Sequence, residues 1–291
     1  MLRLVLPKGS LEQATLQLFE DADLAVNRAS SVDYRAYVDD PRISDVTILR
    51  PQEIPHYVAE GLFDVGITGR DWVAETEAEV HTLSELHYSK ATARAIRVVL
   101  AVAEDAPWRQ AADLPHHVRV HTEYPQITRR YFERHNVEAL ISRSYGATEA
   151  KVPEIADAVV EITETGRALR AAGLRVIDEI LVSYTELIAN PAAYAQPEKR
   201  RAMTQLQTLL VGALEARGRV LLKLNVDADD LDGIIAQLPA LRAPTVNELH
   251  GGGGYAVETV VSKSEINTLI PALSEAGASG IIELPILKIV P

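Results

Sequence analysis

Short apolar runs alternate with segments of helical spacing along the first part of the chain. From Leu11 to Ala22, apolar residues recur every three or four positions, which is the pattern of a helix with one buried face. The predicted elements are a strand at 2–6, a helix at 10–23, a strand at 46–49, a helix at 51–60 and a strand at 63–68. Because strand and helix alternate, the pattern predicts a largely parallel, doubly wound sheet.

A second run of the same kind begins near Arg97. It predicts strands at 98–102 and 118–121, a helix at 126–135 and a strand at 158–162. The two runs predict two α/β lobes that face each other across a cleft, where the ends of the strands create ligand sites.

The C-terminal quarter of the chain has a different order of elements. A helical spacer at 198–217 leads into a strand at 220–226, a helix at 231–238, strands at 245–249 and 255–262, a helix at 264–276 and a strand at 280–289. The order β-α-β-β-α-β is typical of a ferredoxin-like domain.

Composition narrows the classes of function. The 291 residues carry a net charge of −12, which argues against broad binding to nucleic acid or to an anionic membrane. The chain has no cysteine, so disulfide scaffolds, thiolate zinc sites and a cysteine nucleophile are excluded. The apolar N-terminal run is too short for a signal peptide, and no apolar run is long enough for a membrane span, so we expect a cytoplasmic protein.

The loop Thr163-Glu164-Thr165-Gly166 is the most informative segment. It follows a buried strand and precedes a helix, so free helix amides and two threonine hydroxyls form a phosphate cradle. Gly166 allows close approach of an anion or a positive φ. Glu161 is an acceptor for ribose hydroxyls or a ligand for Mg²⁺ beside a pyrophosphate. The alternative is a plain helix cap after a core strand.

Two more turns repeat this layout at strand ends. Lys8 and Gly9 follow the first strand, and Gly66 to Asp71 follow the third. A lysine-glycine turn alone is commonly only a turn, and Asp71 alone could simply complement a helix dipole. Three such turns in one chain together favour a site for a phosphorylated sugar.

Several motifs, in the same order, resemble the ATP phosphoribosyltransferase family. The resemblance covers essentially the whole chain and rests on segments 7–11, 50–58, 64–71, 122–125, 146–149, 163–166, 187–190, 238–241, 243–246 and 256–261. It implies two lobes like those of type II periplasmic binding proteins and a C-terminal regulatory domain. The expected domains are 1–92 with 182–216 for the first lobe, 93–181 for the second and 217–291 for the regulatory domain.

The resemblance also implies an activity and its partners. The family transfers phosphoribosyl from phosphoribosyl pyrophosphate to N1 of the adenine of ATP, with Mg²⁺, as the first step of histidine biosynthesis. The residues it implies for phosphoribosyl pyrophosphate are Asp157, Glu161, Thr163, Glu164, Thr165, Gly166, Arg167, Ala168 and Leu169. Those for ATP are Lys8, Gly9, Gly69, Asp71 and Tyr124, and those for catalysis are Lys8, Arg50, Asp71, Glu149 and Glu161. No residue is singled out as a ligand of the metal.

For the C-terminal domain the resemblance implies feedback inhibition by L-histidine. The expected effector residues are Asn225, Leu241, Thr245 and Ala278. A plain oligomerisation domain is the alternative, and the family suggests dimers that assemble into hexamers. Two competing functions stay open at this stage, a periplasmic small-molecule binding protein and a catalytically inactive regulatory subunit.

Overall fold

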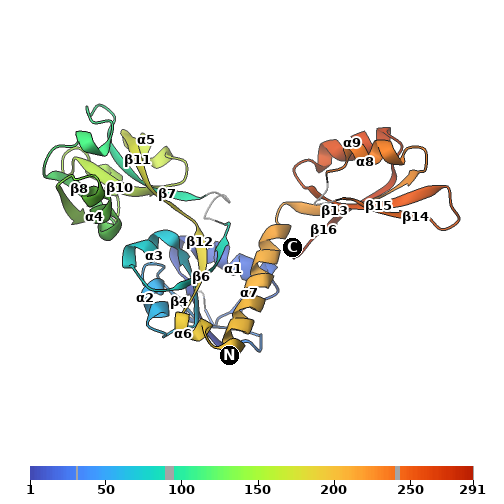
Figure 1. The fold of residues 1–291 in the computed structure, drawn as a ribbon, viewed down its shortest axis with the longest axis horizontal. Coiled ribbons are helices and arrows are strands. Elements are labelled where there is room, and N and C mark those ends of the chain that lie inside the picture. The colour runs from blue at the N-terminus through green and yellow to red at the C-terminus, as the bar shows by residue number, and fades with distance from the viewer. Residues whose placement is uncertain (31, 89–94, 240–242, 291) are drawn as a thin grey trace. The chain divides into compact units, whose positions relative to one another are not determined.

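The computed structural model describes residues 1–30, 32–88, 95–239 and 243–290. The chain divides into two compact units, Met1–Gln207 and Thr208–Pro291, and the division falls inside the long helix α7 (Pro197–Ala216). Figure 1 shows α7 running from the first unit into the second.

The first lobe of the larger unit is built on a seven-stranded sheet of order β2-β3-β4-β1-β5-β12-β6. Its strands are β1 (Leu2–Pro7), β2 (Val26–Asn27), β3 (Arg35–Val38), β4 (Ile43–Leu49), β5 (Val65–Gly69), β6 (His81–Leu86) and β12 (Thr185–Ala189). Its helices are α1 (Glu12–Asp21) with the 3-10 turn Gly9–Leu11 before it, α2 (Ile54–Ala59), α3 (Arg70–Thr76), α6 (Pro191–Tyr194) and the first part of α7.

The second lobe is built on a five-stranded sheet of order β11-β7-β10-β8-β9. Its strands are β7 (Ile96–Ala103), β8 (Val118–Thr122), β9 (Ala139–Arg143), β10 (Ala158–Thr163) and β11 (Leu174–Ser183). Its helices are α4 (Pro125–Arg134) and α5 (Arg167–Ala171), with 3-10 turns at Ala111–Asp113 and Thr148–Lys151.

Both sheets of the larger unit are mixed, and β8 and β9 of the second lobe are a parallel pair. In the first lobe β1 runs parallel to β4 and β5, whereas β12 runs antiparallel to both β5 and β6. In the second lobe β10 is parallel to β8 but antiparallel to β7. The prediction of a largely parallel sheet was therefore wrong at these strands. The chain leaves the first lobe after β6 and returns as β12, and this return strand inserts in the opposite direction.

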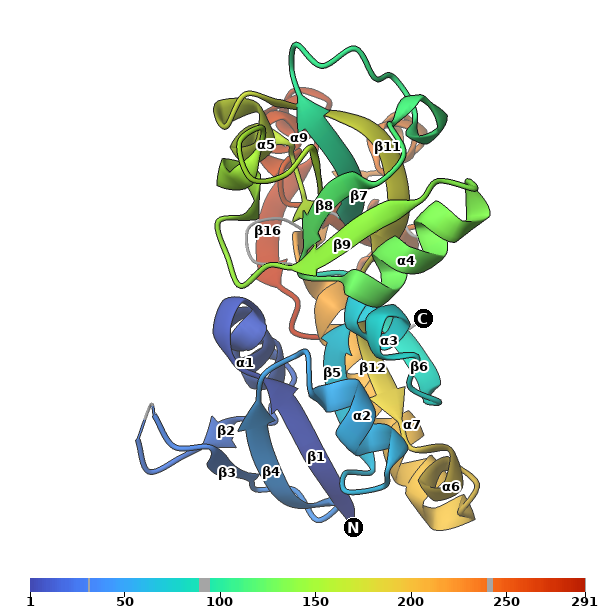
Figure 2. The same ribbon diagram turned by 90° about the vertical axis from the view of Figure 1, so that its left-hand side faces the viewer.

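The two lobes meet along α3 and α4, which lie side by side (Figure 2). Trp72 of α3 is buried among the core residues of the second lobe, and its ring lies 4.6 Å from that of Tyr124. The carboxylate of Glu75 accepts hydrogen bonds from the amides of Gln126 and Ile127, the latter at 3.0 Å, and so caps α4 from the opposite lobe. Packing and capping together hold the lobes at this edge.

The smaller unit is a ferredoxin-like domain, as predicted. Its elements are β13 (Arg219–Asp227), α8 (Leu231–Gln237), β14 (Thr245–Glu248), β15 (Gly254–Ser262), α9 (Ile266–Glu275) and β16 (Ser279–Pro285). The antiparallel sheet has the order β14-β15-β13-β16. Alternate residues of β13, such as Leu222 and Leu224, are buried in a core shared with residues of α8 and α9.

None of the helices in the described ranges is long and apolar enough to cross a membrane.

Candidate active site

The carboxyl ends of the central strands of the first lobe carry the polar residues that the sequence singled out. Leu49 of β4 is the register partner of Pro7 of β1, so Lys8 and Arg50 follow the two strands side by side. Asp71 follows β5, on the other side of β1. Parallel strands end at the same edge of a sheet, which is where ligands bind in open α/β sheets.

A cavity of about 370 Å³ lies at this edge, between the two lobes. The first lobe contributes the turn before α1, the turn before α2 and the start of α3. The second lobe contributes the segments that follow β8 and β10. The lining residues are Ser10, Leu11, Pro51, Gln52, Gly69, Asp71, Trp72, Tyr88, Ile96, Glu123, Tyr124, Ile162, Thr163, Glu164, Ser183, Tyr184 and Thr185.

Asp71 is the centre of a buried hydrogen-bond network in this cavity. The hydroxyl of Tyr124 donates to its Oδ2 at 2.8 Å, and the hydroxyl of Ser183 donates to its Oδ1 at 2.6 Å. The backbone amide of Asp71 in turn donates to Ser183 Oγ at 3.0 Å. The network joins a helix of the first lobe, a loop of the second lobe and the end of the strand that returns between them.

Burial dominates the electrostatics of this network. It raises the pKa of the Asp71 carboxyl above its usual value, although the hydroxyls of Ser183 and Tyr124 oppose the shift by donating to the carboxylate. Burial and the neighbouring Asp71 carboxylate raise the pKa of the Tyr124 phenol well above its usual range. Tyr124 is therefore a hydrogen-bond donor at neutral pH and not a base.

The loop between β10 and α5 is a tight turn held by its own hydrogen bonds. Gly166 has a φ of +72°, in the left-handed region that favours glycine, and it directly precedes α5. Its amide donates to Thr163 Oγ1 at 2.7 Å, and Arg170 donates to the carbonyl of Thr165 at 3.0 Å. These two bonds hold the loop in one shape beside the cavity, which Thr163 and Glu164 line.

Three carboxylates gather near this loop. The pKa of Glu161 on β10 is raised by burial and further by the charges of Glu123 and Glu149. A cation or a set of hydroxyl donors at this place would relieve the repulsion. No group of three or more His, Asp or Glu side chains in the described ranges is arranged to hold a metal ion by itself.

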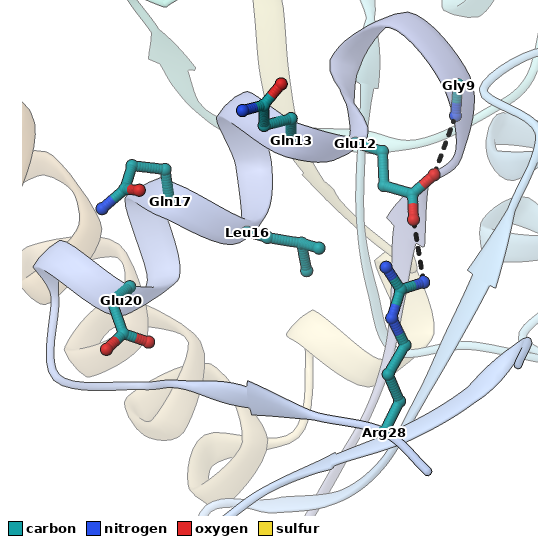
Figure 3. Close-up of a pocket in the computed structure, with 7 residues that line it drawn as sticks. All are labelled: Gly9, Glu12, Gln13, Leu16, Gln17, Glu20 and Arg28. Atoms are coloured by element: carbon teal, nitrogen blue, oxygen red, sulfur yellow. Dashed lines mark hydrogen bonds and ion pairs between the residues drawn. The ribbon is translucent and has the colours of Figure 1, made fainter. Parts of the chain in front are cut away.

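Two of the residues expected to contact ATP lie apart from the cavity between the lobes. The ammonium of Lys8 lies 4.0 Å from the ring centre of Tyr34, in a cation–π contact. Gly9 lines a second cavity of about 500 Å³ along α1. There the Glu12 carboxylate accepts from the Gly9 amide at 3.3 Å and pairs with Arg28 at 2.8 Å, as Figure 3 shows.

The segment implied for phosphoribosyl pyrophosphate is also divided by the fold. Asp157 precedes β10 and pairs with Arg119 at 2.7 Å, so the length of the strand separates it from the loop. Leu169 is buried in the core of the second lobe, whereas Arg167 and Ala168 are exposed in the first turn of α5. The structure thus brings Thr163 to Gly166 together and leaves Asp157 and Leu169 in structural positions.

The expected effector residues lie in different parts of the smaller unit. Asn225 and Thr245 lie on strands, on the sheet face opposite the core residues of β13. Ala278 is buried within that core, and Leu241 lies outside the described residues.

Sequence reasoning missed most of the residues that line the cavity, and Ser183 and Gln52 are two polar examples. Ser183 lies 112 positions along the chain from Asp71, and only the return of β11 to the first lobe brings the two together. Gln52 precedes α2 in a motif that the sequence analysis used only as a family signature. Neither residue belongs to a pattern of charge or glycine that would have marked it.

Comparison with known proteins finds relatives over the whole chain. A family model described as ATP phosphoribosyltransferase matches residues 50–212, and one described as HisG, C-terminal domain matches residues 216–288. The ATP phosphoribosyltransferase of Desulforudis audaxviator is 47% identical over 292 residues, covering 100% of this chain and 99% of the relative. That of Pelotomaculum thermopropionicum is 46% identical over 290 residues, with the same two shares.

A solved structure of an ATP phosphoribosyl transferase is also similar to the larger part of the chain. The structure described as the ATP phosphoribosyl transferase (HisG:HisZ) complex from Thermotoga maritima has a TM-score of 0.63 and 28% identity. It covers 74% of this chain and 99% of that one.

Proposed function

The chain belongs to the ATP phosphoribosyltransferase family, and on that premise we propose how its residues share the reaction. The enzyme transfers phosphoribosyl from phosphoribosyl pyrophosphate to N1 of the adenine of ATP and releases pyrophosphate, which begins histidine biosynthesis. One observation carries the assignment of the site. The strand ends of both lobes that bear the family's motifs border one cavity.

Phosphoribosyl pyrophosphate binds to the second lobe. The amides of Glu164, Thr165, Arg167 and Ala168 hold the 5-phosphate around the left-handed turn at Gly166, whose own amide is bonded to Thr163 Oγ1. The Glu161 carboxylate accepts from the ribose hydroxyls, which relieves its repulsion with Glu149. Asp157 is left out of this set because its carboxylate is paired with Arg119.

ATP binds to the first lobe. Lys8 and Arg50 are neighbouring cations at the ends of β1 and β4, and they bind phosphate groups against the net negative charge of the chain. Gly69, Asp71 and Tyr124 line the part of the cavity that takes the adenine. Gly9 lies in the turn before α1, and its amide is already bonded to Glu12, so it contributes to the ATP site only by shaping this turn.

The carboxylates near the loop suit a magnesium ion that arrives with the pyrophosphate. Mg²⁺ keeps several waters and binds one or two carboxylates together with substrate phosphates, so a cluster of three protein ligands is not required. Glu161 and Glu149 would hold the ion there. When bound, the ion neutralises the charge of the leaving pyrophosphate.

Catalysis follows from alignment and electrostatics. Adenine N1 has a lone pair and needs no general base, so no residue has to remove a proton before attack. Positive charge develops at the anomeric carbon as pyrophosphate leaves, and the carboxylates of Glu161 and Glu149 stabilise it. The contacts between α3 and α4 hold the lobe that binds ATP and the lobe that binds phosphoribosyl pyrophosphate in a fixed relative position, which aligns the two substrates for reaction.

The remaining parts of the proposal concern organisation. The two lobes comprise residues 1–92 with 182–216 and residues 93–181, and residues 217–291 form a domain that binds L-histidine as an inhibitor. Asn225 and Thr245 share one face of its sheet and are the first candidates for that contact. The enzyme acts in the cytoplasm as dimers that assemble into hexamers.

The experiment that tests the site uses two glycines that flank α5. Both Gly166 and Gly173 have a positive φ, at +72° and +73°, so alanine strains the backbone at either position. Gly166→Ala is expected to raise the KM for phosphoribosyl pyrophosphate about tenfold or more, because a tilted loop loses amide contacts to the 5-phosphate. The KM for ATP is expected to change little.

Gly173→Ala is the matched control. Nothing lies within 4 Å of the added Cβ, and the residue is at the far end of α5. It is expected to strain the backbone as Gly166→Ala does, without the 2.6 Å contact that a Cβ at 166 makes with Arg170, and to leave both KM values near those of the wild type. Equal KM values for phosphoribosyl pyrophosphate in the two variants would contradict the assignment of the loop.

A further inference from the structure

Gln52 has an unsatisfied polar atom beside the cavity between the lobes. Its side-chain carbonyl oxygen, Oε1, is buried and has no hydrogen-bond partner among the described residues. Buried polar atoms are nearly always bonded, so an unbonded one at a ligand cavity indicates a missing donor. Gln52 is also one of the residues that line this cavity.

The backbone around Gln52 is fixed on both sides. The amide of Glu53 donates to the carbonyl of Arg50 at 3.0 Å, which closes a turn just before α2. The hydroxyl of Thr68 donates to the carbonyl of Pro51 at 2.8 Å, which ties the same turn to β5. The side chain of Gln52 is therefore presented from a rigid support.

The cavity around this side chain suits a flat heteroaromatic ring. Leu11, Pro51 and Ile96 supply partly exposed apolar surface, and the buried side chains of Trp72 and Tyr124, whose rings pack against each other, also line the cavity. These side chains offer apolar surface and few hydrogen bonds. The polar edge of such a ring would need its partner elsewhere, and Gln52 is placed to be that partner.

We propose that Gln52 reads the N6–N7 edge of the adenine of ATP. A glutamine amide presents an acceptor and a donor side by side, and adenine presents a 6-amino donor beside the N7 acceptor, so the two match as a bidentate pair. The Oε1 atom accepts from the 6-amino group and the Nε2 group donates to N7. This inference rests on the proposed binding of ATP in this cavity.

The geometry of the pair agrees with the reaction. N1 lies on the other side of the 6-amino group from N7, so a contact through N6 and N7 leaves the N1 lone pair free to attack. A contact through N1 and N6 would block the nucleophile. Thr163 and Glu164, which line the same cavity from the second lobe, belong to the loop assigned to the phosphoribosyl group.

The test is a competition between ATP and 7-deaza-ATP, in which carbon replaces N7. Full-length wild-type and Gln52→Met enzymes receive both nucleotides with phosphoribosyl pyrophosphate and Mg²⁺, and mass spectrometry measures the ratio of the two products. The intrinsic reactivity of N1 differs between the nucleotides but is common to both enzymes, so it cancels in the comparison. Gln52→Met is expected to reduce the preference for ATP by about threefold to tenfold, the effect of one hydrogen bond.

Gln205→Met is the matched control, because Gln205 is exposed on α7 and does not line the cavity. It is expected to keep the wild-type product ratio. A ratio within twofold of the wild type in Gln52→Met would overturn the role of Gln52 while leaving the activity of the family in place. Wild-type enzyme that forms no product from ATP would instead contradict the proposed function, and with it this inference.

A second measurement needs no variant. Titration calorimetry of the wild-type enzyme is expected to show that 7-deaza-ATP binds about threefold to tenfold more weakly than ATP. Equal dissociation constants would overturn the proposed contact with N7.

Discussion

Removing the hydroxyl of Tyr124 is expected to weaken the junction between the two lobes. Tyr124 is 1% exposed and Asp71 is 2% exposed, so water does not replace the bond between them in Tyr124→Phe. A hydrogen bond to a buried charged group contributes about 2 kcal/mol to the free energy of unfolding. For a unit of this size such a loss lowers Tm by roughly 4–8 °C.

The cost of Tyr124→Phe is also expected to depend on pH. Burial raises the pKa of Asp71 in the folded state, so protonation of this carboxyl adds stability as pH falls through that raised value. A neutral carboxyl accepts a weaker bond than a carboxylate. The difference in stability between wild type and variant should therefore be largest above the folded-state pKa of Asp71 and shrink below it.

The assay is thermal unfolding of both proteins across a pH series. Tyr145→Phe is the control, because the Tyr145 side chain is 90% exposed, and it is expected to leave Tm unchanged. A Tyr124→Phe variant with the Tm of the wild type at neutral pH would refute the reasoning. So would a destabilisation that grows as the solution becomes more acidic.

Two further predictions concern buried carboxylates of the first lobe. Glu75→Gln is expected to lower the free energy of unfolding, measured in urea, by about 1 kcal/mol, because a neutral amide caps the first turn of α4 less well than a carboxylate. The control Glu60→Gln, at an exposed position, should leave the free energy of unfolding unchanged. Equal losses in the two variants would contradict the capping role of Glu75. Lys199→Met removes the 2.8 Å ion pair with Asp64. Burial acts to raise the pKa of Asp64, but hydrogen bonds from the Arg3 amide and from Lys199 outweigh it and lower the pKa below its usual value. A lowered pKa gives stability that is lost as pH falls through the folded-state pKa, so Lys199→Met should lose less stability than the wild type in acid. Lys263→Met, at an exposed lysine, should follow the wild type. An unchanged acid profile in Lys199→Met would contradict the role of this ion pair.

The sequence predicted the elements whose apolar runs are uninterrupted. The runs at 2–6 and 98–102 became β1 and β7, the latter within the core of the second lobe. The strand β11 was missed because Asp178 and Glu179 interrupt its apolar residues and most of its side chains are only partly buried. The spacing of apolar residues could not indicate β11, because this strand is held in place by pairing with β7 and not by burial of one face.

The prediction of the site was most successful where residues follow a strand directly. Lys8, Arg50 and Asp71 each follow a central strand, so their common edge could be inferred from local order alone. The inference failed to extend to Ser183, because its contact with Asp71 depends on the return path of the chain. It also could not show that the Asp157 carboxylate is paired with Arg119 at the start of β10.

The central claim is that ATP and phosphoribosyl pyrophosphate bind and react in the cavity between the lobes. It is tested most directly by the absorbance of phosphoribosyl-ATP when the purified protein is mixed with both substrates and Mg²⁺, with pyrophosphatase to remove the second product. We predict steady formation of product that Gly166→Ala slows at low phosphoribosyl pyrophosphate and that millimolar L-histidine suppresses. Folded protein that forms no product under these conditions would contradict the account.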